Sequence, residues 1–219
     1  MLRIGIVDDH KLFRKSLGLL INSFEGMTVV IDAENGRIFL DSLATTAVDL
    51  VLLDIQMPEM NGYETCVALH RTHPEIMILI VSQLTTKESI HKIMELGANG
   101  YFTKNSDPDQ LEYAIRSLHQ NGYYFGMELG SVLREAMLWE KKFPSAPDIS
   151  GNRLSAREVE ILKMAAQEYS SGEIGVRLFI TLRTVESHRK RIMQKTGAKN
   201  IVGAVLFAIK QRYFLLEEL

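Results

Sequence analysis

The chain of 219 residues has a single cysteine, Cys66, and only five prolines. One cysteine excludes an internal disulfide framework and suits a reducing compartment such as the cytoplasm. No apolar run approaches the roughly 20 residues that a membrane-spanning helix needs. The apolar start of the chain turns acidic at Asp8 and Asp9, which is unlike a signal peptide. These absences predict a cytoplasmic globular protein that does not bind a membrane.

Charge is distributed unevenly along the chain, although the net charge is only −2. Residues 1–138 contain 11 Lys and Arg against 18 Asp and Glu, whereas residues 153–219 contain 12 against 7. Between them, residues 141–152 (KKFPSAPDISGN) are rich in proline and serine and poor in apolar residues, as solvated linkers are. The sequence therefore predicts a first domain over residues 1–120, a connector helix and linker over 121–152, and a basic domain over 153–219. A basic domain favours a polyanionic partner.

The first 120 residues alternate five apolar runs with five helical patterns. Strands are predicted at 2–7, 27–31, 48–53, 76–81 and 99–103, and helices at 10–24, 36–43, 63–71, 87–96 and 108–119. This alternation predicts an α/β fold, a doubly wound five-stranded parallel sheet with helices on both faces. The run Val48–Leu53 is almost wholly apolar, as expected for a central strand that is buried on both faces.

Polar residues stand where these predicted strands end. Strand one ends on Asp8 and Asp9, strand three on Asp54, strand four on Ser82 and strand five on Lys104. Because the carboxyl ends of parallel strands meet at one edge, these side chains should lie together. Three neighbouring carboxylates repel at neutral pH and require a cation, and Mg²⁺ suits such oxygen ligands. Lys104 and the Ser82 hydroxyl would then hold an anion beside Asp54, as phosphoryl transfer to that carboxylate needs.

Further short motifs accompany these residues, and together they resemble a response-regulator receiver domain. The pieces that carry the resemblance are Asp8-Asp9, Asp54, Met57-Pro58, Asn61-Gly62, Ser82 and residues 97–104 (GANGYFTK). The resemblance implies that a histidine kinase phosphorylates Asp54. It also implies that Asp9, Asp54 and the Gln56 carbonyl ligate Mg²⁺, while Asp8 helps through water.

The same resemblance implies roles around the phosphoryl group. Lys104 would pair with this group, Ser82 would donate a hydrogen bond to it, and Tyr101 would be the aromatic switch residue that moves inward on activation. His10 follows the two acids at a helix start, and we interpret it as an exposed structural histidine rather than a phosphocarrier.

Two other chemistries of α/β proteins fit the sequence less well. A dinucleotide-binding site requires a glycine-rich turn after the first strand, but residues 8–11 (DDHK) contain no glycine. A phosphatase similar to the haloacid dehalogenase family requires a second aspartate two residues after the nucleophilic one. Two residues after Asp54 this sequence has Gln56. Both alternatives are therefore disfavoured.

The basic domain reads as four short helices. Ser155–Glu158 and Ser170–Glu173 match capping boxes, and Thr181 offers a third cap. The third helix is predicted at 184–196 and the fourth at 201–211. Phe179-Ile180 separates the second and third helices at the spacing of a helix-turn-helix. The sequence thus predicts a small all-α helix-turn-helix domain after the sheet.

The third of these helices is basic on one side. From Arg183 to Lys199 there are six basic residues and one acid, Glu186. A charged face on the second helix of a helix-turn-helix is typical of a reader of double-stranded DNA in the major groove.

This half resembles the LuxR-type DNA-binding domain of the NarL/FixJ response regulators. The matching residues are Leu154-Ser155-Ala156-Arg157-Glu158, Glu173-Ile174, Leu178, Thr184-Val185-Glu186-Ser187-His188 and Asn200. The resemblance assigns base-edge contacts to Glu186, Ser187 and Lys190, and it implies that the inactive receiver masks this helix. Its phosphate contacts fall on the neighbouring basic residues, Arg183, Arg189 and Lys195.

Two details of this half stay open at the level of sequence. Glu186 either accepts a hydrogen bond from cytosine N4 or pairs with Arg183, Arg189 or Lys190 on its own helix. The last helix has more apolar residues than a small core covers, so we expect part of it to form a homodimer contact when the protein is active. The residues concerned are Val202, Val205, Leu206 and Ile209.

Together these patterns predict a two-component response regulator that controls transcription and is not an enzyme. One alternative is an adaptor whose helical domain binds a protein instead of DNA, and a second is an aspartyl-phosphate hydrolase. The basic helix argues against the adaptor, and a salt-dependent duplex-binding assay separates these classes.

Overall fold

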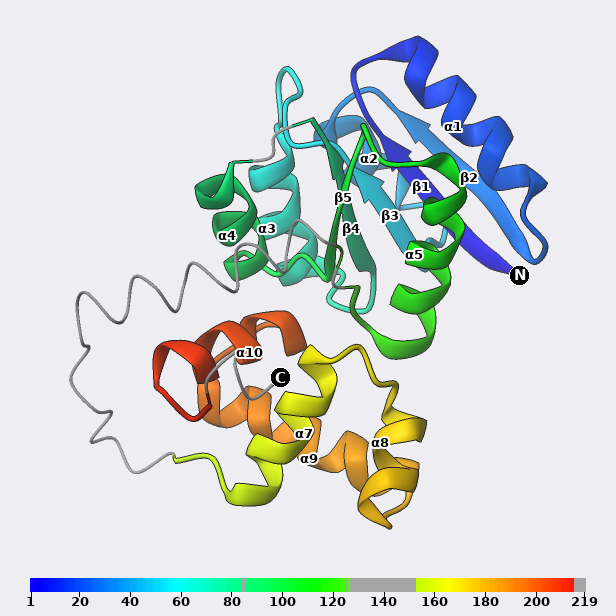
Figure 1. The fold of residues 1–219 in the computed structure, drawn as a ribbon. Coiled ribbons are helices and arrows are strands. Elements are labelled where there is room, and N and C mark those ends of the chain that lie inside the picture. Colours follow the sequence, from blue (N-terminus) through cyan, green and yellow to red (C-terminus); the bar gives the residue numbers. More distant parts are fainter. Residues whose placement is uncertain (84–85, 125, 127–152, 215–219) are drawn as a thin grey trace.

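The computed structural model describes residues 1–83, 86–124, 126 and 153–214 (Figure 1). Five parallel strands form one sheet in the order β2-β1-β3-β4-β5. The strands are β1 (Leu2–Val7), β2 (Met27–Ala33), β3 (Leu50–Leu53), β4 (Met77–Ser82) and β5 (Gly100–Thr103). The predicted doubly wound parallel sheet is confirmed. Its strand order reverses direction between β1 and β3, and open α/β sheets place their sites at such a point.

Helices cover both faces of the sheet (Figure 1). Helices α1 (Lys11–Ser23) and α5 (Pro108–Asn121) pack on one face, and α2 (Gly36–Ser42), α3 (Gly62–Thr72) and α4 (Lys87–Glu95) pack on the other. The strand β3 shows why its sequence is apolar throughout. Leu50 and Leu52 belong to the core under α1 and α5, whereas Val51 and Leu53 belong to the core under α2 to α4.

Strand and helix boundaries differ from the predicted ones by one to two residues. β3 begins at Leu50 rather than Val48, and β2 continues to Ala33. Helix α5 continues to Asn121, where Gly122 ends it in the left-handed conformation with φ 79°. These differences follow from sheet pairing and helix capping, which decide an end more strongly than side-chain polarity does.

The loop from β3 to α3 folds tightly around the strand end. The Asn61 side chain accepts from the Glu64 N–H, and the Glu64 carboxylate accepts from the Asn61 N–H, a capping box that the sequence analysis missed. A Cβ at Gly62 would lie only 2.2 Å from the Asp54 carbonyl oxygen. Only glycine therefore allows α3 to begin so close to Asp54.

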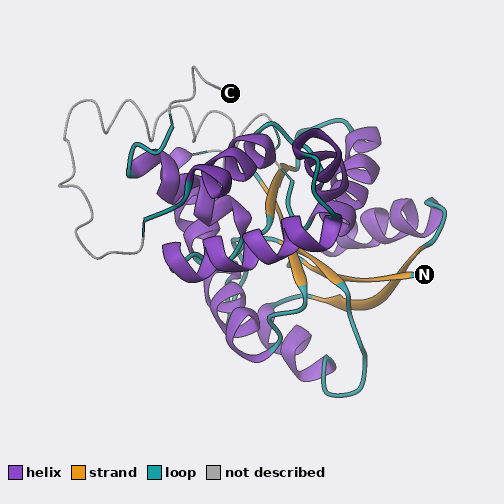
Figure 2. Ribbon diagram, turned by 90° about the horizontal axis from the view of Figure 1, so that it is seen from below, coloured by secondary structure: helices purple, strands orange, loops and turns teal. Residues whose placement is uncertain are grey.

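The chain after residue 153 is helical in its described part. It forms α7 (Ala156–Ala166), α8 (Ser171–Leu178), α9 (Leu182–Thr196) and α10 (Ile201–Lys210). Figure 2 views the molecule from the side on which these helices lie, and its strands all belong to the sheet of the first part. Both predicted capping boxes are present, and the Thr181 side chain accepts from the Thr184 N–H. The predicted all-α second part is confirmed.

Two contacts fix the helix-turn-helix geometry. Burial would raise the pKa of the Glu158 carboxyl, but hydrogen bonds from Lys195 and Ser155 lower it further than burial raises it. Glu158 is thus an ionised acceptor whose Oε2 lies 2.7 Å from Lys195 Nζ, which ties α7 to α9. A Cβ at Gly175 would lie 2.8 Å from the Ile180 carbonyl oxygen. Glycine therefore gives α8 a close turn that alanine would obstruct, in addition to its cost in helix propensity.

Two of the predicted segments, the connector helix at Glu128–Trp139 and the linker at 141–152, lie outside the described residues. The domain boundaries at 120 and 152 stay predictions. No helix in the described part is long and apolar enough to cross a membrane.

Candidate functional site

Sheet pairing brings the predicted strand-end residues together. Val7 pairs with Leu53, and the Asp54 N–H donates to the Val7 carbonyl at 2.9 Å, so Asp8 and Asp54 follow side by side. On the other side of β4, the Lys104 N–H donates to the Ser82 carbonyl at 3.0 Å. Four strands from different parts of the sequence thus place the polar residues at their ends on one edge of the sheet.

Lys104 bridges two of the carboxylates. Its Nζ lies 2.6 Å from Asp8 Oδ2 and 2.7 Å from Asp54 Oδ2, and these three side chains are only 6%, 3% and 5% exposed. Burial alone would lower the pKa of Lys104, but the hydrogen bonds to Asp54 and Asp8 raise it above its ordinary value. The Phe13 ring centroid lies 4.8 Å from Nζ and covers it. A buried ammonium group therefore stands beside Asp54.

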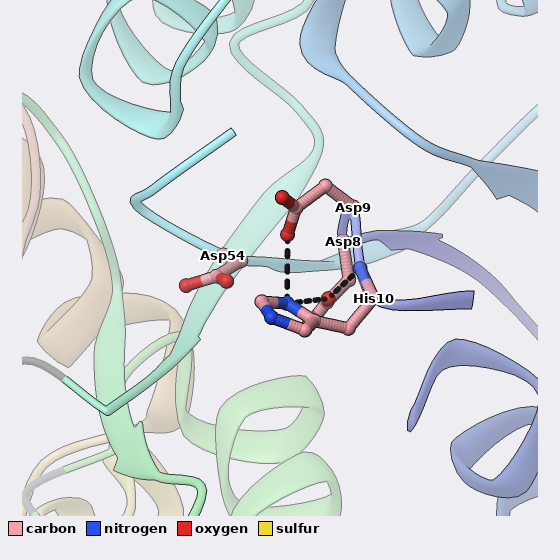
Figure 3. Close-up of side chains that lie close together, drawn as sticks. All are labelled: Asp8, Asp9, His10 and Asp54. Carbon is pink, nitrogen blue, oxygen red and sulfur yellow. Dashed lines mark hydrogen bonds and ion pairs between the residues drawn. The ribbon is translucent and has the colours of Figure 1, made fainter. Parts of the chain in front are cut away.

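Asp9 and His10 complete the outer side of this cluster (Figure 3). The His10 Nδ1 lies 2.8 Å from Asp9 Oδ1 and 3.4 Å from Asp8 Oδ1, and the Asp9 side chain is 35% exposed. One ligand atom from each of Asp8, Asp9, His10 and Asp54 lies within 4.8 Å of all the others. The sequence analysis gave His10 a structural role. Its position directly after two site acids was the signal that it faces the site.

The donor set fits a divalent cation. Asp54 Oδ2 and Asp8 Oδ2 are held by an ammonium group that balances part of their charge, while Asp9 is turned to the solvent side of the same cluster. Gln56 lies exposed in the loop that follows Asp54. Carboxylate and carbonyl oxygens are the ligands that hard dications prefer.

Ser82 and Tyr101 are buried residues of the two strands next to β3 on this side of the sheet, β4 and β5. Ser82 is the last residue of β4 and is 1% exposed, and Tyr101 on β5 is fully buried in the core under α2 to α4. The ring predicted to move inward on activation is therefore inward in this structure.

The sequence analysis did not include Arg14 among the site residues, because arginine is usually a surface residue. Its guanidinium donates to the Asp8 backbone carbonyl and to the Asp32 carboxylate, and the side chain is 9% exposed. Arg14 thereby links α1 to the end of β1 and holds Asp8 in place. Its position on the helix after the two acids was the only sequence signal.

Helix α9 exposes most of its polar residues and buries two apolar ones, whereas Leu182 at its start is 56% exposed. Val185 and Ile192 are buried, and the exposed predicted DNA contacts are Arg183, Glu186, Ser187 and Lys190. Two other predicted contacts are engaged elsewhere in the chain. Lys195 pairs with Glu158, and the Arg189 side chain is only 12% exposed.

Arg189 reaches from α9 to the first part of the chain. One guanidinium nitrogen, Nη2, donates to the Asn121 carbonyl at 2.9 Å, and the guanidinium lies 5.4 Å from the centre of the Tyr123 ring. The other, Nη1, lies 2.7 Å from Ser171 Oγ and 3.1 Å from Glu186 Oε1. Of the two interpretations of Glu186, pairing within its own helix is the one seen in this structure.

A second contact area joins α10 to α4 and its following loop. Asn200 Nδ2 donates to the Ala98 carbonyl at 2.5 Å, and Lys210 Nζ lies 2.8 Å from Glu95 Oε1. In this structure Val202, Val205, Leu206 and Ile209 are at most 3% exposed, and α10 packs against α7, α9 and α4 of the same chain. A homodimer contact of α10 in the active protein stays a prediction.

Comparison with known families identifies both halves. Residues 4–116 match the family described as "Response regulator receiver domain", and residues 152–208 match "Bacterial regulatory proteins, luxR family". The chain belongs to the response regulators. This response regulator is 30% identical to the oxygen regulatory protein NreC of Staphylococcus epidermidis over 214 residues, which cover 96% of this chain and 98% of NreC. NreC of Staphylococcus haemolyticus is 30% identical over 216 residues.

Solved structures agree with this assignment. A LuxR-family response regulator from Aurantimonas is 28% identical, with a TM-score of 0.58, over 62% of this chain and 97% of that chain. RcsB from Salmonella enterica serovar Typhimurium, solved on a promoter with a phosphomimetic, is 20% identical with a TM-score of 0.58, over 95% of this chain and 98% of RcsB. At that identity RcsB shows the fold alone. The response regulator is thus a DNA-binding member of a two-component system with a receiver fold and a LuxR-type helical part.

Proposed function

We propose that Asp54 is the phosphoryl acceptor of this response regulator and that a histidine kinase supplies the group. The observation that carries the proposal is the buried Lys104 ammonium, which bridges Asp8 Oδ2 and Asp54 Oδ2. A fixed cation next to one carboxylate oxygen stabilises the negative charge that a phosphoryl group brings. Intact-mass measurement with a phosphoryl donor tests this proposal.

The residues suggest how the transfer takes place. An Asp54 carboxylate oxygen attacks the phosphorus of a phosphohistidine, so that a P–O bond forms while the P–N bond breaks. The histidine nitrogen leaves with the electron pair of that bond. Lys104 then exchanges its hydrogen bond to Asp54 for one to a phosphoryl oxygen, and the Ser82 hydroxyl donates to another. Tyr101, the proposed switch residue on β5, would stabilise the positions that β4 and β5 take after this exchange of hydrogen bonds.

A dication would be held by Asp9, Asp54 and the Gln56 carbonyl, with Asp8 acting through water, and Mg²⁺ is the ion we propose. When bound it neutralises charge on the acid cluster and on the phosphoryl oxygens. Asp8 is kept in position by the Arg14 guanidinium on its backbone carbonyl and by the His10 N–H on its Oδ1 at 2.8 Å. The chain itself thus orients the acids before any ion arrives.

Helix α9 is the proposed reader of double-stranded DNA. Its exposed face carries the predicted base-edge contacts Glu186, Ser187 and Lys190 on the second helix of a helix-turn-helix. Arg183 lies exposed at the start of this helix and would contact phosphate. Arg189 and Lys195 would contact phosphate only after leaving their present partners. We propose that the cytoplasmic protein binds as a homodimer to neighbouring half-sites.

The contacts of Arg189 support a closed form in which the receiver restrains the reader. The Arg189 side chain is only 12% exposed and donates to the Asn121 carbonyl, so it must leave these partners before it can contact a DNA phosphate. Phosphorylation of Asp54 would shift the balance toward an open form, because the two forms differ in which partners these groups bind.

Replacing Lys190, a proposed base-edge contact, with alanine should weaken binding to the selected DNA site, and it should lower the salt dependence of that binding only if the ammonium group also touches a phosphate. Each lost phosphate contact reduces the slope of log K against log salt by about 0.9. Titration of a labelled duplex at several salt concentrations measures both quantities. Lys11→Ala is a matched control, because it removes one positive charge from an exposed position on α1, far from α9. Unchanged affinity of Lys190→Ala for the selected site would contradict the base-edge contact, and an unchanged slope would show that Lys190 touches no phosphate.

Replacing Glu186 with alanine should raise non-specific DNA binding, because a carboxylate that faces phosphates is removed. Glu186 is 52% exposed while it pairs with Arg189. If the open form releases Glu186 to accept from cytosine N4, the variant should also lose about 1–3 kcal/mol of discrimination at one base pair. Selection from a random duplex pool decides this. An unchanged consensus would assign Glu186 to the pairing with Arg189 alone.

A further inference from the structure

His10 stands at a helix start without acting as a cap. It is the N-cap residue of α1, with φ −79° and ψ 93°, yet its side chain accepts no hydrogen bond from the first turn. Its N–H donates to Asp8 Oδ1 at 2.8 Å, and its ring is turned toward the acid cluster (Figure 3). The ring is 70% exposed and therefore has room to reorient.

The spacing of the cluster matches that of ligands around one ion. Ligand atoms of an octahedral dication are about 3.0 Å apart when adjacent and about 4.2 Å apart when opposite, given metal–oxygen distances near 2.1 Å. His10 Nδ1 lies 2.8 Å from Asp9 Oδ1, and the four ligand atoms lie within 4.8 Å of one another. Small rotations of exposed side chains would bring His10 and Asp9 to adjacent positions of one coordination sphere.

We propose that His10 is a nitrogen ligand of the ion that Asp9 and Asp54 bind, an inference that rests on the proposed receiver site. Imidazole favours borderline dications such as Co²⁺ and Zn²⁺, whereas Mg²⁺ prefers oxygen. The site therefore takes Co²⁺ more tightly, relative to Mg²⁺, than the same site with an oxygen donor at position 10. His10 acts here as a determinant of which ion is bound.

The test replaces His10 with asparagine. Asparagine is a good N-cap residue, so the start of α1 is kept while the nitrogen ligand becomes an amide oxygen. Calorimetric titration with Co²⁺ alone and with Mg²⁺ alone should show the Co²⁺ affinity falling about tenfold or more, since even outer-shell changes cost about 10–100-fold. The Mg²⁺ affinity should change less than about threefold. His119→Asn, at an exposed position on α5, should change neither affinity.

Proton NMR of the Co²⁺-loaded protein gives a readout that a structural role for His10 would not produce. A histidine bound to Co²⁺ shows an exchangeable imidazole N–H resonance far outside the diamagnetic range. The signal should be present in wild type and His119→Asn and absent in His10→Asn. Wild-type protein that binds Co²⁺ without this signal, or a His10→Asn protein with undiminished Co²⁺ affinity, would overturn the proposal.

Phosphorylation separates this inference from the proposed function. The His10→Asn protein should still gain a phosphoryl group at Asp54 in Mg²⁺, because the oxygen ligands and Lys104 remain. If the His10→Asn protein is phosphorylated normally and still binds Co²⁺ as tightly as wild type, the role of His10 is rejected while the proposed function stands. Loss of Co²⁺ selectivity with phosphorylation retained would support it.

Discussion

An Asp54→Asn protein should gain no phosphoryl group under conditions in which the wild type gains one. Asparagine keeps the size of the side chain, but its amide oxygen lacks the charge and nucleophilicity of the carboxylate that stands 2.7 Å from Lys104 Nζ. The wild-type adduct should be labile to acid and sensitive to hydroxylamine, as acyl phosphates are. Intact-mass spectrometry after incubation with Mg²⁺ and a small phosphoryl donor measures the difference.

Two controls define this result. Asp41→Asn changes an exposed aspartate on α2 and should leave the phosphoryl uptake intact. Chelation of the metal should abolish uptake by the wild type, because the acids of the cluster would be left to repel each other and the incoming group. Undiminished phosphorylation of the Asp54→Asn protein would contradict the assignment of Asp54 as the phosphoryl acceptor.

A Tyr123→Leu protein should bind DNA more tightly than wild type when neither is phosphorylated. Tyr123 Oη donates to the Tyr169 carbonyl at 2.5 Å, and the Tyr123 ring lies 5.4 Å from the Arg189 guanidinium. Loss of one hydrogen bond and one cation–π contact destabilises the closed form by about 1–2 kcal/mol. Leucine keeps apolar volume at this buried position. Because apparent affinity scales with the population of the competent form, we expect a gain of about tenfold.

The design separates opening from direct contact with DNA. Tyr123 belongs to the receiver side, so its replacement leaves every residue of α9 unchanged, whereas Arg189→Ala would alter both. Tyr113→Leu is the matched control, because Tyr113 is 59% exposed on α5 and its ring contacts Tyr124. Duplex titration of the unphosphorylated proteins measures the effect. Equal affinities for Tyr123→Leu and wild type would show that these contacts do not restrain the reader.

The sequence by itself determined the sheet and its site edge. Continuous apolar strands such as Leu50–Leu53 are buried on both faces, and the polar residue that ends each one must lie at the carboxyl edge. Asp8, Asp54, Ser82 and Lys104 could therefore be placed before any coordinates, since periodicity and strand ends are local properties. The caps at Ser155, Ser170 and Thr181 were equally readable, because a cap is a pattern of four consecutive residues.

Only the tertiary structure decided which partners the site residues hold. Arg189 lies 68 positions from Asn121 and Lys210 lies 115 from Glu95, and no local pattern reports such a pairing. The packing of α10 against α4, the pairing of Lys195 with Glu158 and the orientation of the His10 ring toward the acid cluster are of the same kind. Each depends on how helices and strands pack against one another. A rotation of one element changes the contacts that all of its side chains make with neighbouring elements. Local sequence fixes which groups reach a surface, and packing decides what they meet there.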